Sequence, residues 1–289
     1  MNRLICAIFV LFLAVGNSYA RSSISVIDFN ATDFGKLTAE KFRTYFKTGE
    51  EFLVADADLS RSAAMGFGYQ GSLNLTVNEA RYLGAALATD FYLLGDAQLL
   101  RRSSSEKPVY YEAYCSVFVV SSRTGRLLFW DRPSFENNDA VQARELLLKG
   151  LTSGEMIHRL LIAIRRTNED ERSERMIIPP ATQVIEEAPD DEKVAEAQGL
   201  RLPRPYRRLR PEYPLSAARA EAEATVDVLV AIGADGEISD VQVARWAGFG
   251  LDEATVTTVR QMHFFPAMKN GTAIPLRVLL RYNFRKPPR

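Results

Sequence analysis

The sequence predicts an α+β protein with two domains: an N-terminal α/β domain with sandwich-like layers, and a small C-terminal β-β-α-β domain. Short strand-like and helix-like stretches alternate from residue 24 to about 166, which is typical of layered structures. Residues 167–205 then carry acidic runs and little periodicity, and residues 206–289 are compact and strongly patterned. At 289 residues the chain is long enough for two domains of ordinary size.

Residues 1–20 are expected to be a secretory signal peptide. Arg3 precedes an apolar run, residues 4–15, which spans about 18 Å as a helix and falls short of a hydrocarbon core of about 30 Å. Ser18 and Ala20 form the small-x-small pattern that signal peptidase prefers. We expect cleavage after Ala20; the alternative is an uncleaved segment that anchors the chain in a membrane.

Residues 21–166 are expected to form the first domain. Strand-like stretches predict five strands, at residues 25–29, 51–55, 90–100, 110–121 and 126–132, and the turn at residues 122–125 is expected to join the last two as a hairpin. A helix is expected to begin at Thr38, and a second follows the capping box of Thr76 and Glu79. Helical spacing returns from Ala140 to Ile164, and residues 152–155 could cap a separate helix there. The glycines from Gly66 to Gly71 favour a loop.

Residues 167–205 are interpreted as a charged linker. The stretch contains acidic runs and the proline pair at residues 179 and 180, and it lacks the periodicity of a helix or a strand. A flexible chain of this length has a root-mean-square span of about 35 Å. We therefore expect a tether that holds two domains at variable distance.

The C-terminal part, residues 206–289, has the clearest pattern. Residues 225–233 and 237–246 read as a hairpin across the turn at Asp235 and Gly236. Asp252 is expected to cap a helix that runs to Met262, and Asn270 with Gly271 predicts another turn. Residues 274–284 alternate apolar and other side chains, as a final strand with one buried face does.

An ordered set of motifs makes residues 207–286 resemble the C-terminal domain of the TonB family of energy-transducing envelope proteins. The matching motifs are Tyr213–Pro214, Asp235–Gly236, Leu251–Ala254, Phe265–Ala267, Asn270–Gly271 and Phe284. The resemblance implies a β-β-α-β domain whose edge strand pairs with a short segment of an outer-membrane receptor. The chain departs from the family in its brief acidic linker, because a family transducer has an anchor and a long proline-rich spacer.

The N-terminal domain is similar, over two short strings, to an α/β domain of other envelope proteins. Residues 26–29 and 87–95 resemble strands in the curli assembly protein CsgG, in penicillin-binding-protein activator lipoproteins and in the N-terminal part of TolB. The resemblance implies another module for protein interaction.

Together these observations predict a periplasmic, non-enzymatic adaptor that binds an envelope protein, with a TonB-dependent outer-membrane receptor as one candidate partner and transport as one candidate role. The expected partner-binding residues are the outward side chains of the final strand and the Tyr-Pro pair: Arg277, Leu279, Arg281, Asn283, Tyr213 and Pro214. The alternative is a structural scaffold that associates with itself as a homo-oligomer, without energy transduction.

The composition does not favour catalysis or nucleic-acid binding. Lysine plus arginine and aspartate plus glutamate each total 36, so no basic excess indicates a nucleic acid. Cys115 lies in an apolar run and is expected to be a buried, inert thiol, while His158 and His263 are expected at the surface or in packing. No histidine or cysteine pair has metal-ligand spacing, so neither a metal nor a cofactor is expected. The arginines between residues 201 and 210 could contact an anionic surface or could simply be solvated.

Overall fold

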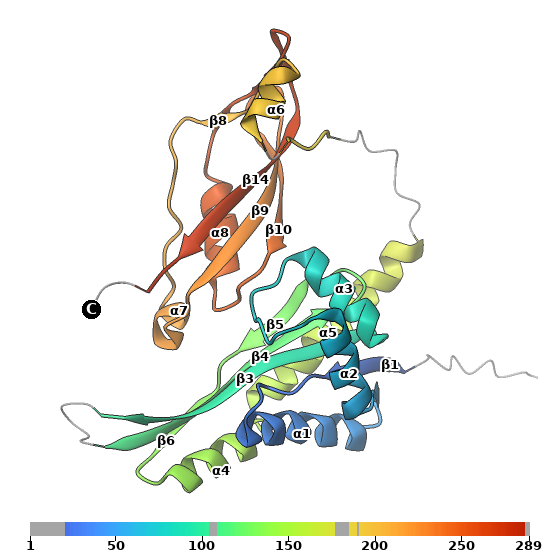
Figure 1. Ribbon diagram of the computed structural model, residues 1–289, viewed down its shortest axis with the longest axis vertical. Coiled ribbons are helices and arrows are strands. Elements are labelled where there is room, and N and C mark those ends of the chain that lie inside the picture. Colours follow the sequence, from blue (N-terminus) through green and yellow to red (C-terminus); the bar gives the residue numbers. More distant parts are fainter. Residues whose placement is uncertain (1–20, 104–108, 177–184, 190, 287–289) are drawn as a thin grey trace, which may run out of the picture.

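The two domains and their connection are drawn in Figure 1, a computed structural model that describes residues 21–103, 109–176, 185–189 and 191–286. The expected signal peptide, residues 1–20, lies outside the described residues. In the described part of the chain, no helix is long and apolar enough to cross a membrane. The α+β class is confirmed.

The N-terminal domain is built on a mixed six-stranded sheet. Its main path runs β2 (Phe52–Val54), β1 (Ser22–Val26), β3 (Phe91–Arg102), β4 (Tyr110–Ser121) and β5 (Leu127–Asp131), while β6 (Ser134–Asn137) also pairs with β4. β1 is parallel to both of its neighbours, and the other pairs are antiparallel. The predicted hairpin through residues 122–125 is confirmed, because it joins β4 to β5.

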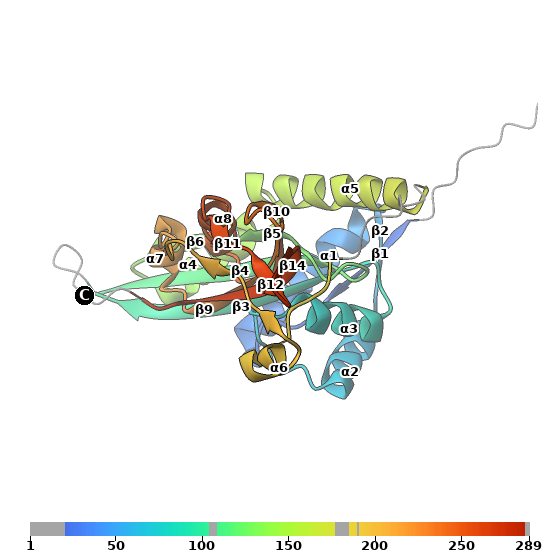
Figure 2. The ribbon, with the colours of Figure 1, turned by 90° about the horizontal axis from the view of Figure 1, so that it is seen from above.

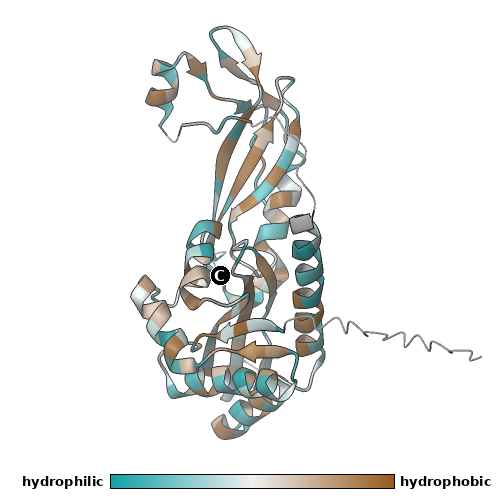
Figure 3. Cartoon of the chain, turned by 90° about the vertical axis from the view of Figure 1, so that its right-hand side faces the viewer, coloured by the Kyte–Doolittle hydropathy of each residue, from teal (hydrophilic) through white to brown (hydrophobic). Residues whose placement is uncertain are grey.

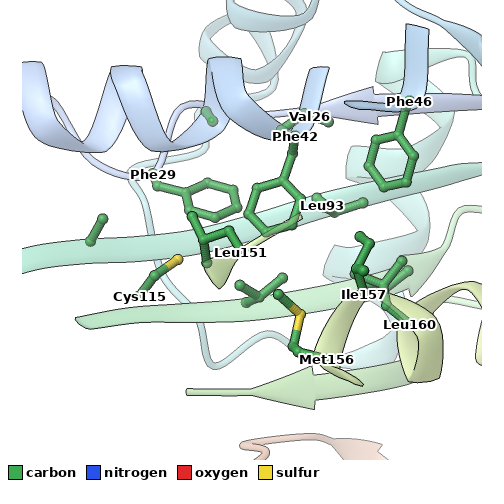
Figure 4. Packing of buried hydrophobic residues seen from close by; sticks show 14 of the residues in the cluster. Val26, Phe29, Phe42, Phe46, Leu93, Cys115, Leu151, Met156, Ile157 and Leu160 are labelled. Carbon is green, nitrogen blue, oxygen red and sulfur yellow. The ribbon is translucent and has the colours of Figure 1, made fainter. Parts of the chain in front are cut away.

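Helices cover both faces of this sheet, as a view from above shows (Figure 2). Buried residues of α1 (Asp33–Thr48), α4 (Ala140–Gly150) and α5 (Glu155–Met176) pack on one face, and those of α2 (Ala57–Phe67) and α3 (Val77–Leu87) pack on the other. Phe42 and Phe46 of α1 meet Leu160 of α5 and the β3 residue Leu93 inside the first of these cores (Figure 4). The domain is therefore a helix–sheet–helix sandwich.

Local chemistry explains where these helices begin. The predicted capping box is confirmed: Thr76 accepts a hydrogen bond from the Glu79 amide at 3.1 Å, and the Glu79 carboxylate accepts from the Thr76 amide at 2.7 Å. The predicted start at Thr38 is wrong, because Thr32 caps α1 by accepting from the Gly35 amide at 3.0 Å. Of the loop expected from Gly66 to Gly71, Gly66 lies instead inside α2, which continues to Phe67, whereas Gly68 ends that helix and Gly71 lies in the loop that follows.

The C-terminal domain is centred on a three-stranded antiparallel sheet in the order β10 (Ile238–Arg245), β9 (Ala224–Ile232), β14 (Leu276–Phe284). Helix α8 (Leu251–Val259) packs on one face of it, and α7 (Leu215–Ala220) adds Ala217 to the same core. The predicted hairpin and final strand are confirmed. The Asn270–Gly271 turn is confirmed as well, between β12 (Ala267–Lys269) and β13 (Thr272–Ile274).

The described residues of the expected linker are largely in helices and strands, so the linker prediction is wrong for them. Helix α5 runs on to Met176, and Figure 3 shows it changing from hydrophobic to hydrophilic along its length. Its polar half stays attached because the Glu171 carboxylate accepts from the Ser121 hydroxyl at 2.6 Å and from Arg123 Nε at 2.8 Å. Downstream lie α6 (Glu192–Ala197), β7 (Leu200–Arg201), which pairs with β12, and β8 (Arg204–Pro205), which pairs with β11 (Phe264–Phe265).

The two domains are docked through the loop that follows β10, and this corrects the expectation of a tether at variable distance. Trp246 is 2% exposed; its ring lies 5.9 Å from that of Phe118, and its Nε1–H donates to the Gly125 carbonyl at 3.0 Å. The Phe249 ring lies 5.6 Å from the rings of both Phe118 and Trp130. Apolar packing and a buried hydrogen bond therefore fix one domain on the other.

A polar clamp beside this loop adds to the docking. The Asn74 side chain donates to the carbonyls of Thr225 at 2.8 Å and Trp246 at 2.6 Å, and it accepts from the Thr225 amide at 3.0 Å. The Arg245 guanidinium donates to the Asn74 carbonyl at 3.0 Å. A single side chain of the N-terminal domain thus forms hydrogen bonds with backbone groups at the ends of two strands of the C-terminal domain.

Candidate functional site

The outer edge of β14 is the candidate site, because β14 lies at the end of the three-stranded sheet. Arg277 shows which backbone groups point outward: its amide donates to the Glu186 carbonyl at 2.9 Å, and its carbonyl accepts from the Ala188 amide at 2.8 Å. Backbone groups alternate in direction along a strand, so those of Leu279, Arg281 and Asn283 face the same way. Among the described residues, these three have no backbone partner on that side.

The chain itself covers the beginning of this edge. Residues 186–188 pair in parallel with Arg277 through the two bonds above, and Glu187 forms an ion pair with the Arg277 guanidinium at 3.8 Å. Lys269 lies 3.4 Å from the Glu186 carboxylate. The edge can therefore accept an extended segment, and one short segment of this chain already occupies its first position.

The predicted outward face of β14 is confirmed, but its side chains differ in availability. Leu279 is 44% exposed and lies opposite Leu229 of β9. The Arg281 guanidinium is bound to Asp227, with Nε 2.7 Å from Oδ1, and the Asn283 Oδ1 accepts from the Thr225 hydroxyl at 2.8 Å. Leu279 is thus the apolar side chain open to a partner, while Arg281 and Asn283 offer chiefly their backbone.

Asp227 organises the polar part of this face. Its side chain is 4% exposed and pairs with both Arg281 and Arg245. Burial acts to raise the pKa of Asp227, but the hydrogen bonds and charges of the two arginines outweigh it and hold that pKa below its ordinary value. The stabilisation from these pairs is present above about pH 4 and is lost as the pH falls, because protonation removes the charge.

The structure does not bring Tyr213 and Pro214 to the edge of β14. The Tyr213 hydroxyl donates to the Ala222 carbonyl at 2.7 Å, and its ring packs 6.4 Å from that of Phe284. Pro214 is the N-cap residue of α7. Both residues hold the segment before β9 against the core, which is a structural role.

Asp252 is also placed differently from the prediction. Gly250 is the N-cap residue of α8, and Asp252 follows inside the first turn. Its two carboxylate oxygens accept from the amides of Ala247 and Gly248, both at 2.8 Å, and so fix the docking loop. Burial raises the pKa of Asp252 to about 7, although these two hydrogen bonds act to lower it.

The groups that could support catalysis are dispersed. Cys115 is buried, as predicted, and burial raises the pKa of its thiol well above the ordinary value. His158 and His263 are both exposed, and His263 Nδ1 lies 3.2 Å from a Glu237 carboxylate oxygen. A cleft of about 1070 Å³ separates β5 from β10, and its described lining holds neither histidine nor cysteine. No cluster of three metal-ligating side chains occurs in the part of the chain that the structure describes.

Sequence reasoning missed the features that join distant parts of the chain. The occupation of the β14 edge by residues 186–188 has no local signal, because a single parallel bridge leaves no periodicity. The sequence also gives no signal for the partners of Asn74, although a polar side chain just before a capped helix often forms a hydrogen bond with a backbone group.

The family comparison supports the assignment of the C-terminal domain. Residues 210–285 match the model of the Gram-negative bacterial TonB protein C-terminal domain. No curated protein matches the chain significantly.

Several solved structures resemble parts of the chain. The TonB C-terminal domain of Pseudomonas aeruginosa is 26% identical, covering 30% of this chain and 89% of that one, with a TM-score of 0.26. The LpoB C-terminal domain from Escherichia coli is 14% identical, covering 43% of this chain and 90% of that one, with a TM-score of 0.28. The lipoprotein GNA1162 from Neisseria meningitidis is 13% identical, covering 43% and 92%, with a TM-score of 0.31.

Proposed function

We propose that this chain, in which residues 210–285 form a TonB C-terminal domain, is a periplasmic adaptor that binds another envelope protein by strand addition to β14. The observation that carries the proposal is the row of outward backbone groups at Leu279, Arg281 and Asn283, which have no backbone partner among the described residues. An extended segment of a partner satisfies such a row by continuing the sheet. The TonB domain supports a TonB-dependent outer-membrane receptor as the partner class.

The geometry at Arg277 indicates how a partner segment would lie. Residues 186–188 pair there in parallel, so a partner that follows the same direction would begin next to Leu279, or would replace the internal segment and begin at Arg277. Leu279 and Leu229 offer an apolar contact to side chains on one face of that segment. Backbone bonds would supply most of the affinity, and these two leucines would supply selectivity.

Domain docking favours an adaptor with fixed geometry over a free tether. The Trp246 contact and the Asn74 clamp hold the β14 sheet in one orientation on the N-terminal domain. A partner bound at β14 would therefore be presented at a defined position relative to whatever the N-terminal domain contacts.

The test is a pair of substitutions at one position. Leu279→Pro removes the outward amide, whereas Leu279→Ala shortens the side chain and keeps that amide. Both variants should keep the circular dichroism spectrum of the parent, because an edge position tolerates proline when its amide is unpaired. In pull-downs from envelope extracts, the partner retained by the parent and by Leu279→Ala should be lost with Leu279→Pro. Equal retention by a folded Leu279→Pro variant would rule out pairing along this strand.

A self-associating scaffold is the second candidate, because an open edge can also pair with the same edge of another copy. Light scattering of purified protein separates the two functions. A stable oligomer that Leu279→Pro converts to a monomer supports the scaffold, and a monomer that still captures a partner supports the adaptor.

A further inference from the structure

We propose that the C-terminal domain carries a second interaction surface, which binds the phosphate headgroups of an anionic phospholipid bilayer. The surface is the arginine–aromatic patch, which we define as Arg204, Tyr206, Arg207, Arg208 and Phe265, with Arg201 and Arg210 on either side along the chain. No residue of the patch belongs to β14 or to the outward residues Leu279, Arg281 and Asn283, although Arg208 acts electrostatically on Tyr282 of that strand.

The charge of this surface is concentrated and uncompensated. Residues 200–211 contain five arginines and no acidic residue. All five are exposed, and none forms an ion pair or a side-chain hydrogen bond with another described residue. Elsewhere, Arg245 and Arg281 both bind the buried Asp227, and Arg43 binds the partly buried Asp28. An unpaired group of guanidiniums is suited to phosphate, which Arg binds in a bidentate manner.

Two aromatic rings lie exposed among these charges. Tyr206 and Phe265 are 61% and 57% exposed, and their centroids are 4.3 Å apart. Backbone pairing fixes their position, because Phe265 pairs with Arg204 across β8 and β11 and the Tyr206 amide donates to the His263 carbonyl at 2.9 Å. Both rings are therefore held at the surface, exposed to solvent, and contribute little to the core.

The patch also lies where a flat surface could reach it. β8 is at the end of the C-terminal domain away from the N-terminal domain, and the segment after it runs along the side of the domain to α7 (Figure 1). Arg207, Arg208 and Arg210 all belong to this segment. The basic stretch that begins at β8 and continues through Arg210 is thus exposed along one outer side of the C-terminal domain.

The combination of charge and exposed rings favours a bilayer over other polyanions. Tyrosine and phenylalanine insert at the boundary between headgroups and acyl chains, while neighbouring arginines meet the phosphates. A nucleic-acid duplex or an acidic protein would engage the guanidiniums and leave the ring pair in water. A single-stranded nucleic acid could stack on the rings, and the experiment includes it for that reason.

The experiment measures co-sedimentation of residues 21–289 with vesicles of phosphatidylcholine alone or with one quarter phosphatidylglycerol, and in parallel the binding of a single-stranded oligonucleotide. This length holds every described element and leaves out the apolar run at 4–15, which could bind lipid itself. The test variant is Arg204→Gln/Arg207→Gln/Arg208→Gln. The matched control is Lys36→Gln/Lys41→Gln/Lys47→Gln on α1, which removes the same charge from exposed positions.

We expect the parent to bind the anionic vesicles and not the neutral ones, and the arginine variant to bind at least about tenfold more weakly. The lysine control should change affinity less than about twofold. Tyr206→Ala/Phe265→Ala should remove the part of binding that survives high salt, because that part is apolar.

Two results would overturn the proposal. The first is no binding to anionic vesicles, and patch-dependent binding of the single-stranded oligonucleotide in that case would assign the patch to a nucleic acid instead. The second is an equal loss of vesicle binding in the arginine and lysine variants.

Discussion

Replacing Trp246 with alanine should separate the two domains or make the protein unfold at a markedly lower denaturant concentration. The side chain is 2% exposed, stacks on Phe118 and donates to the Gly125 carbonyl. Losing a buried tryptophan costs about 3–5 kcal/mol, and the unpaired carbonyl adds about 1 kcal/mol. We therefore expect a loss of about 4–6 kcal/mol, which is a large part of the stability of an ordinary domain.

The assay is urea unfolding followed by circular dichroism, together with small-angle scattering in the absence of urea. With a slope of about 2–3 kcal/mol per molar urea, the midpoint should fall by about 2 M, or the curve should split into two transitions. Trp246→Phe keeps a ring over Phe118 and should cost only about 1–2 kcal/mol. A Trp246→Ala midpoint within 0.3 M of the parent, with an unchanged radius of gyration, would refute the reasoning that this contact docks the domains.

Two further predictions concern charge and the occupied edge. Because burial raises the pKa of Asp252 to about 7, its folded form binds a proton more tightly than its unfolded form, whose pKa is near 3.8. Its contribution to stability is therefore full below about pH 4 and is lost as the pH rises through 7, by about 1.4 kcal/mol per unit. The measurement is the difference in unfolding free energy between the parent and Asp252→Asn, which cancels the contribution of other titrating groups. This difference should fall as the pH rises from about 4 to 7. A difference that does not change with pH would contradict the raised pKa of Asp252. Ala188→Pro removes the amide that donates to the Arg277 carbonyl and so loosens residues 186–188, whose Glu186 carbonyl accepts from the Arg277 amide. Hydrogen exchange of the Arg277 amide should therefore accelerate about fivefold, while the urea midpoint of unfolding stays the same. Unchanged exchange would mean that residues 186–188 are held by other contacts.

Local signals predicted the parts of the fold that local chemistry determines. The Thr76–Glu79 box, the turn at residues 122–125 and the alternation of residues 274–284 each involve neighbours in sequence, and each was confirmed. The end of α5 was not predictable from periodicity, because apolar spacing stops after Ile164 and the helix continues through ion pairs such as Arg123 with Glu171.

The candidate site was predictable in one respect only. Alternation identified the outward residues of the final strand, but it could not show that Arg281 is bound to Asp227 or that Tyr213 supports the core. Trp246 and Phe249 have the same apolar character as core residues, so the sequence alone does not reveal that they join two domains. These features depend on contacts between residues far apart in the chain.

The central claim, that β14 binds a partner through its outward backbone groups, is tested most directly by amide hydrogen exchange of labelled protein with and without its captured partner. The amides of Leu279, Arg281 and Asn283 should exchange rapidly in the free protein and become protected in the complex. Those of Val278, Leu280 and Tyr282, which face β9, should be protected in both states. A complex in which the three outward amides keep their rapid exchange would contradict the claim.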